Sequence, residues 1–150
     1  MSPVVERLVD AYAGQVRIVY RHFPLTNIHP NAVPAARAAE AAGLQGKFWE
    51  MHDAIFEGQS QWSSRTPASA QEIFAGYAAD IGLDVTQWEA DRESDAVKDK
   101  VDADTASARS SRVTSTPSFF INGELVDVFA SSDVVGAFRQ ALINAANANP

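Results

Sequence analysis

A threonine–proline pair at the entrance of an apolar segment is the feature of this sequence most suggestive of chemistry. Thr116 and Pro117 stand in the run VTSTPSFFINGELV, in which an aromatic-rich stretch follows the proline. Proline donates no backbone hydrogen bond, so it is tolerated at the first residue of a strand without having any function. Alternatively, a cis bond before Pro117 would hold the preceding backbone exposed, where an extended substrate can pair with it. The pattern alone is compatible with both interpretations.

The histidines form no recognisable catalytic or metal-binding motif. They are His22, His29 and His52, and no two of them have the HxxxH or HExxH spacing of a metal site. His52 and Asp53 are neighbours on an expected helix, so their side chains should point about 100° apart and make poor joint ligands. No GxSxG elbow and no glycine-rich phosphate loop is present. The histidines are therefore expected to serve loop hydrogen bonding and helix packing, with no metal and no cofactor.

Composition and charge argue against several other classes of function. The chain has 150 residues and no cysteine, which excludes disulfides, thiolate catalysis and cysteine-ligated zinc within it. A formal net charge of −7 argues against a general nucleic-acid binder and against a basic membrane-surface protein. No apolar run reaches the ~18 residues of a membrane span. The first residues, MSPVVERL, lack the pattern of an export signal.

The elements that must position the Thr-Pro pair begin with a helix and a strand. Residues 3–13 place apolar side chains at helical spacing, and Gly14 suits the left-handed position just past the helix end. The run QVRIVYR, residues 15–21, is rich in β-branched and aromatic residues and has apolar residues on both faces. This pattern is typical of an interior parallel strand. A turn-rich connection follows over residues 22–30.

Residues 31–111 are predicted to be wholly helical. An alanine-rich helix over residues 31–45 has Asn31 as its candidate cap. The apolar stripe of a second helix, over residues 46–58, consists of Phe48, Met51, Ile55 and Phe56.

The next helices of this block are predicted from their caps and polarity. Ser69 with Glu72 forms a capping-box pattern, and Asp84 with Gln87 repeats it. The polar stretch 94–111 is expected to be an exposed helix. The carboxylates of residues 89–104 are accordingly interpreted as a solvated face.

After the Thr-Pro pair, the sequence predicts a β-hairpin and a final helix. Asn122 and Gly123 lie between two apolar runs and favour the positive φ angles of a tight hairpin turn. The final helix is amphipathic, with Ser131 or Ser132 as its cap. Its apolar face consists of Val134, Val135, Phe138, Leu142 and Ile143.

Taken together, these segments resemble DsbA-like thiol–disulfide oxidoreductases of the thioredoxin superfamily. The segments that carry the resemblance are YRHFPL (20–25), HPNA (29–32), AARAAEAAGLQGKFWEMHDAIFE (35–57) and VTSTPSFFINGELV (113–126). The likeness covers nearly the whole chain, and QGKFWEMHD and TPSFFING are its specific blocks. The implied fold class is α/β, a thioredoxin-like core with an inserted helical subdomain, lacking the first core strand.

The resemblance implies one DsbA-like domain over residues 1–150. Its thioredoxin-like parts are residues 3–30 and 112–150, and the helical insertion is residues 31–111.

The resemblance also implies roles for the residues around the proline. In the family, a cis-proline strand faces a Cys-x-x-Cys motif whose first cysteine is a low-pKa thiolate at a helix N-terminus. That thiolate attacks or releases substrate disulfides. Ser115, Thr116 and Pro117 match the substrate-binding positions, with Ser115 where the family commonly has glycine. No catalytic residue is expected in this chain, because the Cys-x-x-Cys motif is absent.

The beginning of the sequence departs from the family pattern. The family has a strand and a Cys-Pro-x-Cys motif before the position that matches Pro3, so the chain is interpreted as N-terminally truncated. The missing strand would lie between residues 15–21 and the strand that opens at Pro117, and both would then expose unpaired backbone. Exchange between two copies in a homo-oligomer, rearranged pairing or a partner segment is expected to fill this place.

Two functions are consistent with these observations. The first is a DsbA-like oxidoreductase that acts on protein or peptide thiols and disulfides, usually outside the cytoplasm, with this chain redox-inactive as given. The second is a cysteine-free peptide-binding or assembly module that uses the edge of the proline hairpin. Nothing in the sequence specifically favours a third option, a glutathione-using isomerase on a related fold.

Overall fold

The structure is a computed structural model that describes residue 7 and residues 10–148 of the chain. The chain divides into two compact units. The hairpin unit comprises Met1–Tyr20 and Val113–Pro150, and the helical unit comprises Arg21–Arg112. The connection over residues 22–30, which the sequence assigns to the thioredoxin-like part, therefore belongs to the helical unit.

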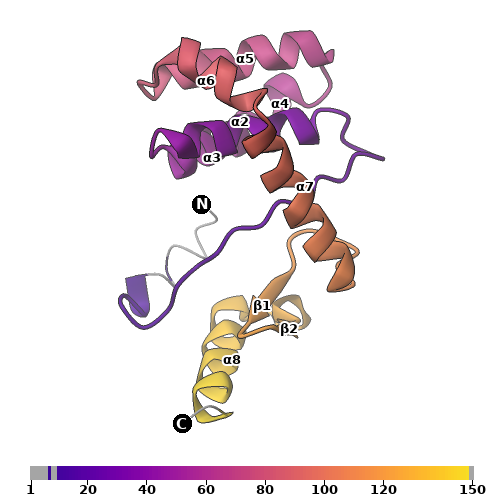
Figure 1. Ribbon diagram of the computed structural model, residues 1–150. Helices are drawn as coiled ribbons and strands as arrows, with labels where there is room; N and C mark the ends of the chain where they lie inside the picture. Colours follow the sequence, from indigo (N-terminus) through magenta and orange to yellow (C-terminus); the bar gives the residue numbers. More distant parts are fainter. Residues whose placement is uncertain (1–6, 8–9, 149–150) are drawn as a thin grey trace. The chain divides into compact units, whose positions relative to one another are not determined.

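The helical unit is built from six α-helices. They are α2 (Ala32–Leu44), α3 (Phe48–Glu57), α4 (Gln59–Trp62), α5 (Pro67–Asp80), α6 (Val85–Arg92) and α7 (Asp95–Ser110). Helices α5 and α6 lie over α2 and α3, and α7 runs past them (Figure 1). The wholly helical block predicted from the sequence is confirmed between residues 32 and 110.

Helix α2 is the centre of this unit because its small side chains allow other helices to approach closely. Its alanines at positions 35, 36, 38, 39, 41 and 42 are all buried, and α3, α5, α6 and α7 each contact the helix. Larger side chains fill the space around it, among them Met51, Phe74 and Trp88. The buried Trp88 indole Nε1 donates to the carbonyl of Ala38, at 3.0 Å, so its only polar atom is satisfied.

In the helical unit, the predicted cap of α6 was correct and the predicted cap of α5 was wrong. Asp84 caps α6, because its carboxylate accepts the backbone N–H of Gln87. Helix α5 begins earlier than predicted, since Thr66 is its cap and accepts the N–H of Ser69, with Pro67 in the first turn. The helix begins at Pro67, with Thr66 as its cap, because proline at the first helical position is already fixed at a helical φ angle.

Two predictions of exposure in the helical unit were also wrong. Phe56 was assigned to the apolar stripe of α3, yet it is 56% exposed. Conversely, α7 is not an exposed helix throughout, because Val97, Val101, Asp104 and Ala108 are buried. These four residues recur at helical spacing and form the face that α7 turns toward the core.

The hairpin unit contains strands β1 (Phe119–Ile121) and β2 (Glu124–Val126), the short 3-10 helix η1 (Val128–Ala130) and helix α8 (Val134–Ala148) (Figure 1). The strands are antiparallel, and Phe120 lies directly opposite Leu125. Asn122 and Gly123 both have positive φ angles, 50° and 91°, which confirms the predicted hairpin turn.

One face of the hairpin packs against α8 and η1. Val128 and Phe138 are the buried centre of this small core, and Phe119, Ile121 and Val126 pack against them. Helix α8 is capped by Asp133, which accepts the N–H of Gly136, and not by Ser131 or Ser132 as predicted. Ile143, assigned to the apolar face of α8, is exposed.

The strand predicted over residues 15–21 is absent. Residues 16–21 have neither helix nor strand structure, and the described part of the chain contains one sheet, formed by β1 and β2 alone. A β-branched composition makes a strand only when a neighbouring strand completes its hydrogen bonds, and no described strand does so here. Gly14 does have the predicted positive φ angle, 75°. The helix predicted over residues 3–13 falls largely outside the described residues.

Within the residues that the structure describes, no helix combines the length and apolar character needed to cross a membrane.

Candidate functional site

The loop that enters β1 brings the predicted substrate-binding residues to the surface. Ser115, Thr116 and Pro117 are all exposed, and the peptide bond between Thr116 and Pro117 is cis. The loop is closed by Ser118, whose hydroxyl donates to the carbonyl of Ser115, at 2.7 Å. Three consecutive exposed residues thus lead directly into the first strand of the hairpin.

The backbone of Thr116 has no hydrogen-bond partner among the described residues. The paired edge of β1 faces β2, and no described strand occupies its other edge. Unpaired N–H and C=O groups next to an open strand edge can bind an extended peptide by adding it as a further strand. Pairing of this kind uses only the backbone of the loop and needs no reactive side chain.

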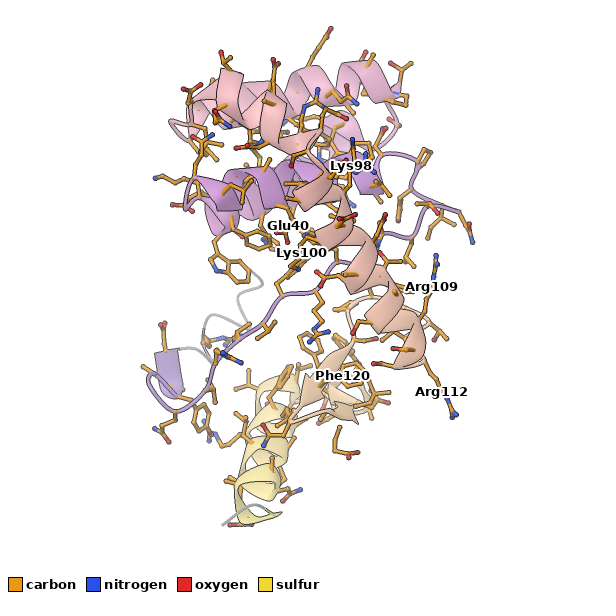
Figure 2. All side chains as sticks on the ribbon, viewed as in Figure 1. Glu40, Lys98, Lys100, Arg109, Arg112 and Phe120 are labelled. Carbon is orange, nitrogen blue, oxygen red and sulfur yellow. The ribbon has the colours of Figure 1, made fainter. Side chains whose placement is uncertain are left out.

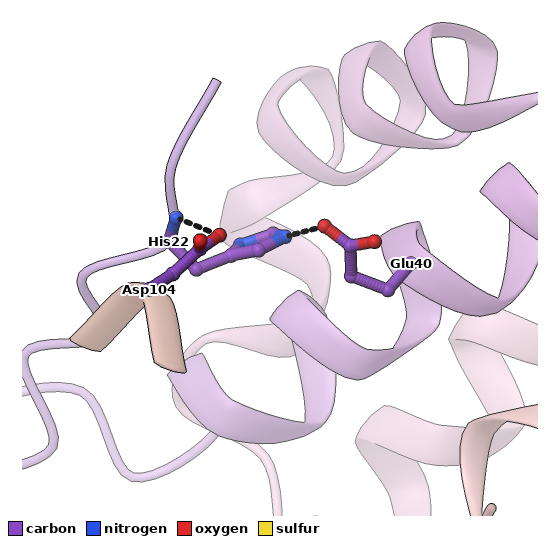
Figure 3. Close-up of side chains that lie close together, drawn as sticks. All are labelled: His22, Glu40 and Asp104. Carbon is purple, nitrogen blue, oxygen red and sulfur yellow. Dashed lines mark hydrogen bonds and ion pairs between the residues drawn. The ribbon is translucent and has the colours of Figure 1, made fainter. Parts of the chain in front are cut away.

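A second cluster of functional groups lies inside the helical unit, around His22. The imidazole Nε2 lies 2.9 Å from Oε1 of Glu40 on α2, and the backbone N–H of His22 donates to Oδ2 of Asp104 on α7, at 3.1 Å (Figure 3). His22 and Asp104 are buried. The histidine therefore joins the segment that opens this unit to two helices at once.

Lys100 supplies positive charge to the two carboxylates of this cluster. Its Nζ lies 2.5 Å from Oδ2 of Asp104 and 3.6 Å from Oε1 of Glu40, and it reaches from α7 toward Glu40 (Figure 2). Burial alone would raise the pKa of Glu40. The hydrogen bond and charge of His22, together with the charge of Lys100, outweigh that effect and hold the pKa of Glu40 below its usual value.

The ligand atoms of His22, Glu40 and Asp104 all lie within 4.8 Å of one another, a spacing close to that of a metal site. The ammonium of Lys100, however, occupies the side of the cluster where both carboxylates converge. The imidazole of His22 is hydrogen-bonded to Glu40, and Lys100 is paired with both Glu40 and Asp104. All three potential ligands therefore already have a partner. The cluster is accordingly a partly buried ion network that links the segment around His22 to α2 and α7.

The other histidines do not join this network. His29 is exposed. His52 is buried on α3, and its Nδ1 lies 2.9 Å from Oδ1 of Asp53, so these two neighbours contact each other although adjacent helical positions point about 100° apart. The long reach of the imidazole ring bridges the angle between adjacent helical positions. Burial lowers the pKa of His52 in spite of the nearby carboxylate.

Sequence reasoning missed Asp104, which was grouped with the solvated carboxylates of residues 89–104. The signal was present in the spacing, because Asp104 falls on the same helical stripe as Val97 and Val101. Glu40 was missed for a different reason: it lies among alanines on α2, and only the fold brings it to His22.

Comparison with known proteins shows to which family this fold and this loop belong. The family model described as "Thioredoxin" matches residues 1–138. A thioredoxin-like oxidoreductase from Silicibacter pomeroyi DSS-3 has a similar structure, with a TM-score of 0.66 and 30% sequence identity over 91% of this chain and 75% of that chain. The chain therefore belongs to the thioredoxin family. Its version of the thioredoxin-like fold is mostly helical, with a small two-stranded sheet.

Curated relatives show a further similarity. The chain is 43% identical over 125 residues to the Na(+)/H(+) antiporter NhaA 1 of Salinispora arenicola, covering 81% of this chain and 18% of that protein. It is 42% identical over 112 residues to the Na(+)/H(+) antiporter NhaA of Herminiimonas arsenicoxydans, covering 75% of this chain and 16% of that protein. The chain thus spans less than a fifth of the length of these relatives.

Proposed function

We propose that this chain is the peptide-binding part of a DsbA-like thiol–disulfide oxidoreductase and is redox-inactive by itself. The observation that carries the proposal is the exposed loop Ser115–Pro117, in which the backbone of Thr116 is unpaired among the described residues and leads into the open edge of β1. Membership of the thioredoxin family and the likeness to a thioredoxin-like oxidoreductase support the redox context.

Peptide binding at this loop follows from the backbone alone. An extended peptide that lies along the edge of β1 exchanges N–H···O=C hydrogen bonds with Thr116, and such bonds do not depend on the peptide's side chains. The exposure of Ser115 and Pro117 leaves room for the neighbouring residues of the peptide. A site of this kind accepts many unfolded segments, which suits an enzyme that acts on protein substrates.

The redox step itself needs a group that the chain does not contain. In thiol–disulfide exchange, a thiolate attacks one sulfur of a disulfide, a mixed disulfide forms and the other sulfur leaves as a thiolate. The chain has no cysteine, so it can neither attack nor be attacked in this way. Any thiol or disulfide that acts on the bound peptide must therefore lie outside these 150 residues.

Titration of the 15N-labelled chain with an unfolded, cysteine-free peptide tests the proposed binding. We expect shifts of the amide signals of residues 115, 116 and 119–121, with little change in α5. Thr116→Pro removes the backbone N–H and should weaken binding about tenfold, as expected for a lost hydrogen bond with its partner left unsatisfied. Thr116→Val keeps the N–H and should bind like the parent. Shifts confined to other elements, or equal binding by both variants, would exclude this site.

The absence of cysteine favours a second candidate, a module whose function ends with peptide binding or assembly. The intact mass of the native protein from its source cells, before and after reduction and alkylation, separates the two. A gain of two alkyl groups would support the oxidoreductase, whereas no gain would support the binding module. We assign no ion transport to this chain, because the likeness to the antiporters covers only a small share of their length.

A further inference from the structure

The hairpin unit exposes apolar side chains on two segments that have the character of strands. Val19 is 59% exposed and Leu125 is 62% exposed, and Ile18 and Phe120 are exposed as well. Phe120 and Leu125 face each other across the hairpin, on the side away from the small core (Phe120 is labelled in Figure 2). Contiguous apolar side chains of this kind usually mark a surface that another chain covers.

Both segments also have a backbone edge with which no described strand pairs. Residues 17–20 form an extended coil with the composition of a strand (Figure 1), and β2 is hydrogen-bonded to β1 on one edge only. Among the described residues, no strand pairs with either of these two edges. An unpaired strand edge beside exposed apolar residues is a template for pairing between chains.

Charge indicates which segment fits the edge of β2. Arg17 opens the coil segment, and Glu124 and Asp127 lie on β2 and just after it. One oxygen of Asp127 accepts the N–H groups of Phe129 and Ala130, which leaves the other oxygen for a cation. Arg17 has no ion-pair partner among the described residues. A segment that begins with arginine and continues with apolar residues therefore complements this edge in both charge and polarity.

We propose that two copies of this chain associate by antiparallel pairing of residues 17–20 of one copy with β2 of the other. The inferred register sets Arg17 opposite Asp127, Ile18 opposite Val126, Val19 opposite Leu125, and Tyr20 opposite Glu124.

This register is favourable on both faces of the added strand. Residues that lie directly opposite share a face, so Val19 covers Leu125 beside Phe120 while Arg17 meets Asp127. On the other face, Ile18 joins Val126 at the margin of the small core. A shift by one residue would set Arg17 beside apolar Val126, which selects the register.

The partner is a second copy because one chain carries both complementary parts. The pairing uses the edge of β2, whereas the proposed peptide site lies on the loop before β1, so neither proposal depends on the other. Failure of one therefore leaves the other standing.

Sedimentation over a wide range of concentrations tests the association. We expect a concentration-dependent dimer, which Val19→Lys weakens about tenfold or more by placing a charge against Leu125 and Phe120. Arg17→Glu should weaken it severalfold through repulsion with Asp127. Arg139→Glu, the same charge change at an exposed position of α8, should leave the dimer unchanged. A monomer at every concentration, or equal effects of both arginine variants, would overturn the proposal.

The absence of cysteine gives a direct test of the register. Val19→Cys and Leu125→Cys chains, mixed and oxidised, can form a mixed disulfide only between copies. We expect this cross-link to exceed that between Val19→Cys and Glu124→Cys, because Glu124 lies on the opposite face. Equal yields would overturn the register. A Val19→Cys/Leu125→Cys double variant that closes its disulfide within one chain would show that the pairing is internal and would overturn the dimer.

Discussion

The imidazole of buried His22 and the carboxylate of half-buried Glu40 form a hydrogen-bonded pair, with 2.9 Å between Nε2 and Oε1. Asp104 accepts the backbone N–H of the same histidine, and Lys100 lies close to both carboxylates. The chain therefore enters the helical unit through a set of charged contacts with α2 and α7. These contacts explain how a segment without strand or helix structure is held in place.

Acid should destabilise the helical unit through Glu40. Its pKa is lowered in the folded chain, so the unfolded chain takes up the proton first as pH falls. The stabilising contribution of Glu40 is present above its unfolded pKa, about 4.5, and is lost as pH falls through the folded value. We expect Glu40→Gln to lower the free energy of unfolding at pH 7 by about 1–3 kcal/mol and to reduce the loss between pH 5 and pH 3.

Urea unfolding at a series of pH values measures this effect. Glu89→Gln, on the exposed surface of α6, is the matched control and should follow the parent curve. If Glu40→Gln and Glu89→Gln changed stability equally at every pH, the ion network would have no part in acid sensitivity.

Lys100 should contribute to stability only through its charge. Lys100→Met keeps most of the side chain's apolar length but leaves Glu40 and Asp104 without their cation. Because the lysine is 45% exposed, water screens part of the interaction, and we expect a loss of about 0.5–2 kcal/mol. Added salt should shrink the difference from the parent. Lys98→Met tests the same change two residues away, where the ammonium lies 4.0 Å from exposed Glu93, and it should have little effect.

Features that depend on neighbours in the sequence were predictable. The turn at Asn122 and Gly123 follows from the preference of these residues for positive φ, and the cap at Asp84 follows from a local side-chain hydrogen bond. Local patterns can still compete with one another: the capping box at Ser69 predicted the start of α5, but the helix begins at Pro67, with Thr66 as its cap.

Features that depend on distant partners were not predictable in this way. Residues 15–21 have the composition of a strand, but a strand also needs a neighbour, which no local pattern provides. Asp104 is buried because it accepts a hydrogen bond from His22, 82 residues away in the sequence. The candidate peptide site was recognised through Thr116 and Pro117, whereas the ion network of Glu40 and Asp104 became visible only in the fold.

The close approach of Gly58 to Tyr77 gives a prediction about packing between α3 and α5. A Cβ at position 58 would lie 1.9 Å from Oη of Tyr77 and 3.0 Å from the carbonyl oxygen of Ala54. The hydroxyl of Tyr77 is buried and has no hydrogen-bond partner among the described residues, and burial raises its pKa. We expect Gly58→Ala to cost roughly 1–3 kcal/mol, because the tyrosine ring must move out of a packed position.

Thermal and urea unfolding of three further variants isolates the cause. Gly76→Ala, in open space on α5, should stabilise the helix by about 0.5–1 kcal/mol. Tyr77→Phe removes the hydroxyl, so Gly58→Ala should cost less in that background than in the parent. An equal cost in both backgrounds would place the strain at the atoms that Tyr77→Phe keeps, which are ring carbon Cζ of residue 77, at 2.7 Å from the new Cβ, and the carbonyl oxygen of Ala54.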